Sequence, residues 1–510
     1  MSNGTNDRFR FEEPVPPAAE LGHVHFIAIG GAGMSGVARI MLAQGLQVTG
    51  SDARESLVTR ALGTEGALVH IGHDASHLEG VDTVVLSSAI RDDNPELAAA
   101  RQRGLRVLHR SQGLASVMRG QRRVAVAGAN GKTTTTSMLT VALQHCGVDP
   151  SFAVGGELAR LGTNAHYGTG DVFVAEADES DGSFVVYHPE VAIVTNVMPD
   201  HLDFYGDYAH VQQAYERFAG TIRPGGVLVT CADDPGARQL AERVRAGGTR
   251  VVSYGEAADA DVRITGLGGR DLQAWATLHQ AGAPDRALRI GVPGEHNLLN
   301  ATAAYVAATV GLGQEPTVVL EGLAGFTGTR RRFEPKGEVQ GVRVIDDYAH
   351  NPGKVTAVVR TGKRLVGDDG RLVVVFQPHL YTRTRDFAAE LAQALSLADV
   401  VVVMEIFAAR EDPLPGVTAA LVADRVHGPG RVVYEPSWQA VAPCVAALVR
   451  PGDLVLTVGA GDVTLVGPEV LGLLAEQHAA EEQREQPAQQ EQRTRHAEQA
   501  VARHLAEGIR

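Results

Sequence analysis

Short apolar runs alternate with longer stretches of helical periodicity along most of this chain. The first such runs cover residues 23–29, 48–52, 84–87 and 107–108, and the segments between them are long enough for helices. Buried strands separated by helix-length segments are typical of a parallel sheet with crossover helices. The pattern therefore predicts an α/β domain that begins near residue 21 and ends near residue 120.

The same alternation predicts two further domains. Strands are expected in the second domain at residues 122–127, 172–176, 191–196 and 227–230, followed by a polar, glycine-rich stretch at 251–291 and a helix at 298–310. The polar stretch is typical of an antiparallel insertion or a sheet edge. Strands of the third domain are expected at residues 342–346, 372–376, 400–403 and 454–458. The fold class is therefore α/β throughout, with a disordered leader at 1–20, domains at 21–120, 121–325 and 326–475, and a solvated or disordered polar tail at 476–510.

Composition agrees with this division and narrows the class of protein. The chain has 510 residues, which suggests three domains at roughly 150 residues each. Its formal charge is 46 minus 60, or −14, which argues against nucleic acid and anionic membranes as partners because both favour basic surfaces. The cysteines Cys146, Cys231 and Cys444 are far apart, and no apolar run reaches the length of about 18 residues needed to cross a membrane. We expect a cytoplasmic enzyme or binding protein.

A first glycine loop, residues 30–36, follows the first expected strand and opens a helix. Gly31, Gly33 and Gly36 form a G-x-G-x-x-G pattern, whose glycines let backbone amides approach a diphosphate at the helix N-terminus. Asp52 ends the next strand, where a carboxylate that contacts a ribose is expected. By itself this pattern also fits NAD, or a glycine-rich helix entry that binds nothing.

A second glycine loop, residues 128–135, joins another strand to another helix. Its order is G-x-x-G-K-T, in which Lys132 can neutralise the outer phosphates of a nucleotide and Thr133 can ligate magnesium. It is shorter than a strict P-loop, because Val126 occupies the position of the first glycine. The surrounding strand and helix favour a nucleoside triphosphate site.

Oxygen ligands for a hard cation follow the strand at 172–176. The carboxylate segment, residues 176–181, has four acidic side chains at a strand end, where α/β proteins place their sites. Its alternative interpretation is an acidic surface loop. His201 follows the next strand and is a further candidate ligand, although a lone histidine in a loop usually has no such role.

Taken in chain order, these motifs resemble those of the Mur ligase family, over roughly residues 23–474. The motifs that carry the resemblance are residues 30–34, 131–135, 176–181, 195–201, 296–300, 328–333, 346–352, 376–385 and 459–463. The resemblance implies a Rossmann-like N-terminal domain for a UDP-sugar, a P-loop ATPase-like central domain for ATP and a Rossmann-like C-terminal domain for an amino acid. It also implies a monomer or homodimer.

The reaction implied by the resemblance is an ATP-dependent, ADP-forming amide ligation in peptidoglycan precursor synthesis, which serves cell wall biogenesis. L-Alanine would be joined to the carboxylate of UDP-N-acetylmuramate through an acyl phosphate. The cofactor set would be ATP with Mg²⁺, or Mn²⁺ in its place.

The resemblance also implies roles for individual residues. Lys132, Glu176 and His201 would be catalytic, with Thr133, Glu176 and His201 as metal ligands. The ATP-binding residues would be Gly128, Ala129, Asn130, Gly131, Lys132, Thr133, Thr134, His296, Asn297, Asn300, Arg332 and Asp347. The UDP-sugar would contact Gly31, Ala32, Gly33, Met34, Asp52, Ser88 and Ala89, and the amino acid Tyr348, His379 and Arg383.

The chain departs from the family pattern at three positions. Ala129 and Asn130 stand where this branch usually has threonine and histidine, and Leu380 stands where some members have arginine. Three alternatives remain beside the leading hypothesis, and Ala129 and Asn130 prompt the second of them. They are a recycling ligase that adds a preformed peptide to the same UDP-sugar, a catalytically silent UDP-sugar-binding protein, and an NAD-dependent dehydrogenase built on the first glycine loop.

Overall fold

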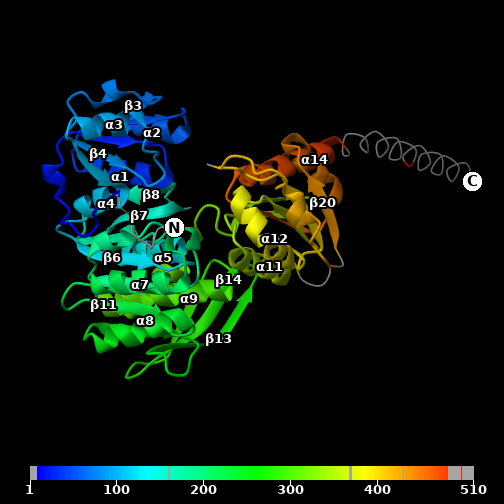
Figure 1. The fold of residues 1–510 in the computed structure, drawn as a ribbon. Coiled ribbons are helices and arrows are strands. Elements are labelled where there is room, and N and C mark those ends of the chain that lie inside the picture. The colour runs from blue at the N-terminus through cyan, green and yellow to red at the C-terminus, as the bar shows by residue number, and fades with distance from the viewer. Residues whose placement is uncertain are drawn as a thin grey trace, which may run out of the picture. The chain divides into compact units, whose positions relative to one another are not determined.

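The computed structural model describes residues 8–158, 161–366, 370–409, 411–428, 430–480 and 496. Its chain divides into two compact units, an N-terminal unit, Met1–Arg330, and a C-terminal unit, Arg331–Arg510. The N-terminal unit contains two sheets and the C-terminal unit contains one (Figure 1).

The first sheet of the N-terminal unit has five parallel strands in the order β3-β2-β1-β4-β5. These strands are β1 Val24–Ile27, β2 Val48–Asp52, β3 Leu68–Ile71, β4 Thr83–Leu86 and β5 Arg106–His109. Its helices are α1 Ala32–Ala43, α2 Leu57–Thr64, α3 Pro95–Gln102 and α4 Arg110–Val117. The strand order reverses between β1 and β4, and ligands of open α/β sheets bind at the carboxyl ends of strands at such a reversal. Both β1 and β4 lead into predicted UDP-sugar residues.

The central sheet has ten strands in the order β15-β14-β13-β12-β11-β10-β6-β9-β7-β8. They are β6 Arg122–Ala127, β7 Ser151–Leu158, β8 Thr163–His166, β9 Val172–Glu176, β10 Val191–Val194, β11 Val227–Cys231, β12 Arg250–Gly255, β13 Val262–Arg270, β14 Gln273–Gln280 and β15 Arg286–Ile290. Strands β13 to β15 pair antiparallel, which confirms the predicted antiparallel edge, whereas β12 pairs parallel with β11.

Helices and one π-helical turn accompany the central sheet. They are α5 Lys132–His145, α6 Leu202–Tyr205, α7 Tyr208–Gly220, α8 Pro235–Ala246, α9 Glu295–Val306, the π-helical turn Ala307–Gly311 and α10 Pro316–Ala324. The 3₁₀ helix η3 Ser183–Tyr187 follows the carboxylate segment. Helix α9 begins three residues earlier than the predicted 298–310 helix, and the π turn completes it.

The two sheets of the N-terminal unit share one hydrophobic core. A single buried cluster includes Val24 of β1 and Met34 of α1 with Phe184 and Tyr215 of the central domain. Helix α1 contacts β7 and β8 (Figure 1). Helix α4 contacts η3. Because apolar burial fixes the two sheets against each other, the two glycine loops are held in a defined relation.

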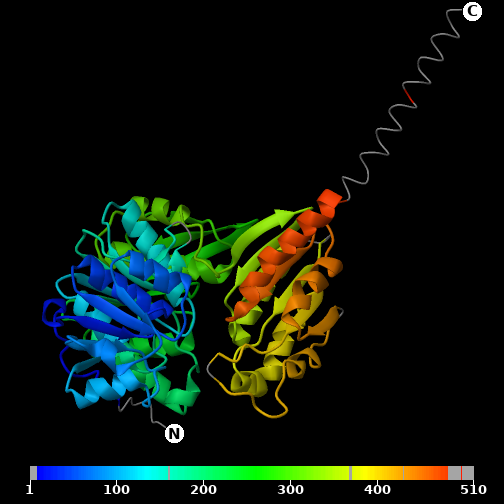
Figure 2. The same ribbon diagram turned by 90° about the horizontal axis from the view of Figure 1, so that it is seen from above.

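The C-terminal unit has a six-stranded sheet in the order β16-β17-β21-β18-β19-β20. Its strands are β16 Glu334–Val339, β17 Val342–Asp347, β18 Leu372–Phe376, β19 Val400–Met404, β20 Arg431–Glu435 and β21 Leu454–Val458, and only β16 pairs antiparallel among these strands. Helices α11 Pro352–Val366, α12 Tyr381–Leu395 and the short α13 Ala420–Ala423 belong to one core, and α14 Trp438–Leu448 to another. A helix over residues 466–480 packs in the second core and lies along the sheet in Figure 2.

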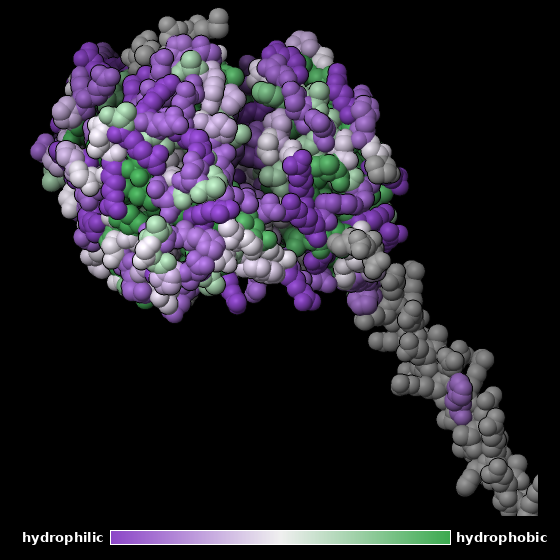
Figure 3. Space-filling view, turned by 90° about the horizontal axis from the view of Figure 1, so that it is seen from below, coloured by the Kyte–Doolittle hydropathy of each residue, from purple (hydrophilic) through white to green (hydrophobic). Residues whose placement is uncertain are grey.

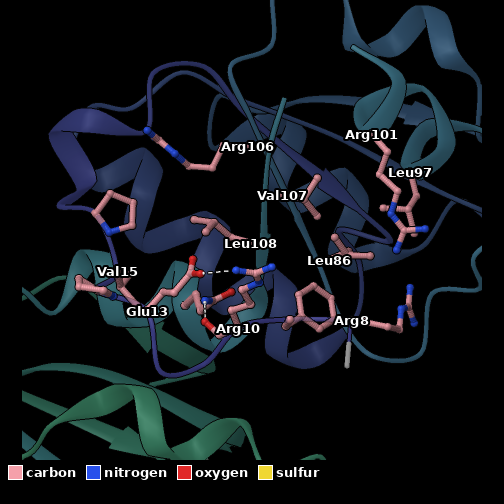
Figure 4. Close-up of a pocket in the computed structure, with 14 residues that line it drawn as sticks. Arg8, Arg10, Glu13, Val15, Leu86, Leu97, Arg101, Arg106, Val107 and Leu108 are labelled. Carbon is pink, nitrogen blue, oxygen red and sulfur yellow. Dashed lines mark hydrogen bonds and ion pairs between the residues drawn. The ribbon is translucent and has the colours of Figure 1, made fainter. Parts of the chain in front are cut away.

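The N-terminal segment differs from the expected disordered leader. Residues 1–7 lie outside the described residues, but residues 8–20 pack on the first domain. Phe9 is 8% exposed and its ring lies 4.9 Å from that of His109, while Gln112 Nε2 donates to the Arg10 carbonyl over 3.1 Å. Burial of an aromatic ring explains why this proline-bearing segment is ordered. It closes one side of a pocket of about 360 Å³, shown in Figure 4.

The expected polar tail lies largely outside the described residues, which after residue 480 include only His496. Within the described part of the chain, no helix is both long and apolar enough to cross a membrane. The face drawn in Figure 3 carries many hydrophilic residues with scattered hydrophobic ones, as on ordinary globular surfaces.

Candidate active site

The first glycine loop turns sharply from β1 into α1. Ala28 has a φ of 61°, and the helix begins after Gly31 without a side-chain cap. Gly30 donates its N–H to Asp52 Oδ2 over 2.9 Å, so the predicted ribose carboxylate fixes the loop itself. An uncapped helix N-terminus presents backbone N–H groups and a positive dipole end, which together favour an anion.

The second glycine loop needs glycine at two positions. Gly128 and Gly131 have φ values of 136° and 88°. A Cβ atom on Gly128 would lie 2.0 Å from Thr195 Oγ1, and one on Gly131 would lie 2.4 Å from Asn300 Oδ1. Any side chain at either position would therefore displace a polar group of the site.

Ala129 and Asn130 depart from the family pattern, but hydrogen bonds still hold the backbone of the second glycine loop. Ala129 is buried, and Asn130 exchanges two hydrogen bonds of 2.9 Å with the Asn196 side chain, one through its N–H and one through its carbonyl. Thr195 also donates to that carbonyl. The backbone turn expected to hold phosphates is thus formed without the family's threonine and histidine.

Lys132 lies in a buried ion pair at the start of α5. Its Nζ donates to Glu179 Oε2 and Oε1 over 2.8 and 2.9 Å and to the Gly128 carbonyl over 2.7 Å, and the two side chains are 14% and 2% exposed. Burial opposes the ammonium charge, but Glu179, Asp178 and Glu176 together raise the pKa of Lys132. Burial raises the pKa of Glu179. The geometry therefore keeps the Lys132 ammonium group charged at the second glycine loop.

Two oxygen donors suited to magnesium lie beside this pair. Thr133 Oγ1 donates to Glu176 Oε1 over 3.0 Å, and Glu176 Oε2 accepts from the Gly155 N–H over 2.7 Å. Among the described residues, no group of three or more His, Cys, Asp or Glu side chains could hold a metal. A hydroxyl and a carboxylate fit Mg²⁺, which takes one or two protein ligands and completes its shell with waters and phosphates.

His201 lies beside the Lys132–Glu179 pair. It adopts a φ of 53° before α6, and its Nε2 lies 4.0 Å from Glu179 Oε1. A left-handed φ in a residue other than glycine is a mark of a constrained site.

The carboxylate segment joins the central domain to the first domain. Arg110 Nη2 donates to Asp178 Oδ2 over 2.6 Å, and Asp181 Oδ2 accepts from Ser88 over 2.7 Å with His109 Nε2 at 3.1 Å. Burial opposes the ionisation of Asp178, but Arg110 and Lys132 lower its pKa to about 2. Because each of its four carboxylates is hydrogen-bonded or ion-paired to another part of the N-terminal unit, the segment is not an acidic surface loop. Ser88 lies in this contact, while Ala89 is exposed.

The start of α9 lies against the second glycine loop. Asn297 and Asn300 are each 7% exposed, whereas His296 is exposed. Asn297 Nδ2 donates to the Pro293 carbonyl over 2.7 Å, and Asn300 Nδ2 donates to Asn297 Oδ1 over 3.3 Å. Asn300 thus borders Gly131, and the three predicted adenine residues stand at one helix end.

In the C-terminal unit, the predicted residues gather at the carboxyl ends of β17 and β18. Asp347 is buried and accepts the N–H groups of Phe333 and Ala349 over 2.8 Å, and burial raises its pKa. The Arg332 guanidinium lies 5.3 Å from the Tyr348 ring centre.

Aromatic rings continue this group along the sheet edge. His350 lies between Tyr348 and His379, with ring centres 5.1 and 5.6 Å away, and His379 stacks on Phe407 at 5.9 Å. Burial, Lys354 and Arg383 hold the pKa of His350 well below its usual range. Leu380 has a φ of 68° where α12 begins.

Family models match all three predicted domains. Residues 23–122 match the Mur ligase family, catalytic domain; residues 126–308 match the Mur ligase middle domain; and residues 331–461 match the Mur ligase, glutamate ligase domain. The chain belongs to the Mur ligase family. The three-domain α/β fold expected of a Mur ligase is confirmed.

Individual Mur ligases are similar over nearly the whole chain. The UDP-N-acetylmuramate–L-alanine ligase of Saccharopolyspora erythraea is 54% identical, covering 92% of this chain and 97% of that protein. The structure of UDP-N-acetylmuramate-alanine ligase from Thermotoga maritima has a TM-score of 0.75 at 29% identity, covering 89% of this chain and 99% of that one. A murein peptide ligase from Psychrobacter arcticus has a TM-score of 0.65 at 25% identity, covering 89% and 98%.

Two residues of this Mur ligase site were missed by sequence reasoning. Glu179 was part of the acidic cluster, but its pairing with Lys132 could not be read from spacing. Arg110 lies two residues after the strand predicted at 107–108, and this position near a strand's carboxyl end was the available signal. The pocket of Figure 4 is lined by none of the predicted site residues, so it is separate from the candidate active site.

Gly131→Ala should weaken ATP binding about 10-fold or more, because it combines a strained φ with a clash against Asn300. Gly147→Ala is the matched control, since Gly147 also has a positive φ but a Cβ atom there would have no described heavy atom within 4 Å. Titration calorimetry with ATP measures both. Equal affinities in the two variants would contradict the assigned role of the loop.

Proposed function

We propose that this chain is an ATP-dependent ligase that joins L-alanine to the carboxylate of UDP-N-acetylmuramate, with release of ADP and phosphate. One observation carries the proposal. Two glycine loops of the phosphate-binding kind belong to one compact unit, and the carboxylate segment between them contacts both Lys132 and the first domain. The similarity to ligases named for this activity supports the choice of acceptor and acid.

The reaction requires activation, because a carboxylate does not react with an amine at neutral pH. A muramyl carboxylate oxygen attacks the γ-phosphorus of ATP, the bond to ADP breaks, and an acyl phosphate forms. The L-alanine amine then attacks the acyl carbon, phosphate leaves with the bonding electrons, and the nitrogen loses a proton. Negative charge concentrates in both transition states, so preorganised cations lower both barriers.

Residues of the second glycine loop supply this charge in the proposal. Lys132 exchanges Glu179 for the outer phosphates, while the backbone from Gly128 to Thr134 holds the phosphate oxygens. Thr133 and Glu176 would hold Mg²⁺ or Mn²⁺, with His201 as a further candidate ligand, and the bound ion would neutralise phosphate charge. His296, Asn297 and Asn300 contact the adenine side of ATP.

The remaining substrates use the other two domains. The first loop, Gly31 to Met34, holds the UDP diphosphate, with Asp52, Ser88 and Ala89 at its border. Tyr348, His379 and Arg383 hold L-alanine, which the row of rings at the carboxyl ends of β17 and β18 supports. Arg332 and Asp347 are assigned to ATP binding. A cytoplasmic location follows from these substrates.

A recycling ligase that adds a preformed peptide is the second candidate function. The similarity to the Psychrobacter arcticus murein peptide ligase favours this candidate, because a ligase named for peptide addition has the same fold over most of this chain. The higher TM-score and identity to the L-alanine ligase favour the leading proposal.

Purified protein with UDP-N-acetylmuramate, MgATP and L-alanine should give an adduct whose mass is the sum of both substrates minus water. One molecule of ADP and one of phosphate should appear for each adduct. The tripeptide L-Ala-γ-D-Glu-meso-diaminopimelate tested in parallel should give no adduct. An adduct with the peptide alone would replace the leading proposal by the recycling activity, and none with either acceptor would reject both.

Lys132→Ala should lower kcat about 10²- to 10³-fold, since it removes a cation that stabilises the phosphoryl-transfer transition state. Calorimetry should show UDP-N-acetylmuramate binding nearly unchanged, because that site uses the first loop. Lys363→Ala, which breaks an ion pair with Asp399 in the C-terminal unit, is the control and should keep full activity. Loss of UDP-sugar affinity together with turnover would argue against separate sites.

A further inference from the structure

Arg110 lies at the junction of the first glycine loop and the carboxylate segment. It begins α4 immediately after β5, and its Nη2 donates to Asp178 Oδ2 over 2.6 Å. Its Nη1 lies 2.5 Å from the position that a Cβ atom on Gly33 would occupy. One guanidinium therefore contacts the central domain on one side and the first turn of α1 on the other.

This arrangement concentrates positive charge at the first loop. The first turn of α1 has no acidic residue and no side-chain cap, so its N–H groups and dipole end meet the guanidinium. The carboxylate of Asp178 pairs with the guanidinium and so compensates one of these two positive features, the other being the N-terminus of α1. A guanidinium carries five N–H donors in a planar fork, so it can hold Asp178 on one edge and present another edge to an anion.

We propose that Arg110 is a further substrate-binding residue, which contacts the diphosphate of the UDP-sugar at the first glycine loop, and that Asp178 orients it there. This inference rests on the proposed function. The central domain then contributes to the UDP-sugar site through Asp178, a positioning residue. The pair is only partly exposed, with side-chain exposures of 28% and 37%, so its geometry is restrained.

The same geometry gives Gly33 a second role. Its lack of a side chain was expected to let backbone approach a ligand, but the atom nearest to the place of a Cβ on Gly33 is Arg110 Nη1. An alanine at this position would push the guanidinium away from the loop. Gly33, the second glycine of the G-x-G-x-x-G pattern, therefore leaves room for the Arg110 side chain.

A purely structural role for Arg110, as a link between the two domains, is the competing explanation. Arg39 is a matched control, because it makes a link of that kind from α1. Its Nη1 donates to Asn164 Oδ1 over 3.1 Å and its Nε to Glu65 over 3.0 Å. Removing either arginine breaks a contact between α1 or α4 and the central domain, but only Arg110 faces the loop.

Titration calorimetry with UDP and with ADP tests the proposal on the full chain. Arg110→Ala should weaken UDP binding about 10- to 100-fold, as expected for a lost charge-assisted hydrogen bond, and leave ADP binding within about 2-fold. Asp178→Asn should weaken UDP binding less, and Arg39→Ala should leave it unchanged. Unchanged UDP binding in Arg110→Ala, or an equal loss for UDP and ADP, would overturn the proposal.

A double-mutant cycle separates a direct contact from general damage. Gly33→Ala should weaken UDP binding in the wild-type background and have little further effect in Arg110→Ala, since the displaced group is then absent. Additive losses would overturn the assignment. The proposed ligation can fail independently: wild-type protein that binds UDP through Arg110 yet forms no alanine adduct would reject the function and retain the site. Wild-type protein that does not bind UDP would reject the site.

Discussion

The buried ion pair between Lys132 and Glu179 is the interaction on which the candidate site depends. A lysine placed for phosphate binding at a largely enclosed loop would carry an uncompensated charge whenever the nucleotide is absent, and such a charge is costly. Glu179 offsets this cost. In the proposed reaction, an incoming phosphate would take the place of this carboxylate. The Lys132 ammonium group can therefore stay charged and largely buried before a nucleotide binds.

That requirement explains why the carboxylate segment is held so firmly. Tyr205 donates its hydroxyl to the Glu179 carbonyl, while Asp178 and Asp181 pair with Arg110 and His109 of the first domain. The counter-ion of the second loop and the contact between two domains are thus one stretch of chain. Side chains that border the two glycine loops are therefore held by adjacent residues of this segment.

Sequence patterns predicted the buried strands well, since a strand covered on both faces is a continuous apolar run. Strands β2, β6 and β9 begin and end at the predicted residues. Strand β3 was missed because it lies at a sheet edge and none of its side chains is fully buried. The same reasoning failed for the leader, where Phe9 supplies an anchor that composition could not reveal. Both glycine loops were predicted from the sequence. The side chains that contact them, above all Arg110, were not, because these contacts join segments far apart in the chain.

In the proposed reaction, ATP held at the second loop transfers its γ-phosphoryl group to the muramyl carboxylate before the amide forms. This order of steps can be followed by isotope transfer, using UDP-N-acetylmuramate with ¹⁸O in both carboxylate oxygens, MgATP and L-alanine, with mass analysis of the products. We expect one ¹⁸O atom in each phosphate released and one retained in the amide carbonyl. Unlabelled phosphate, or label found in AMP, would contradict it.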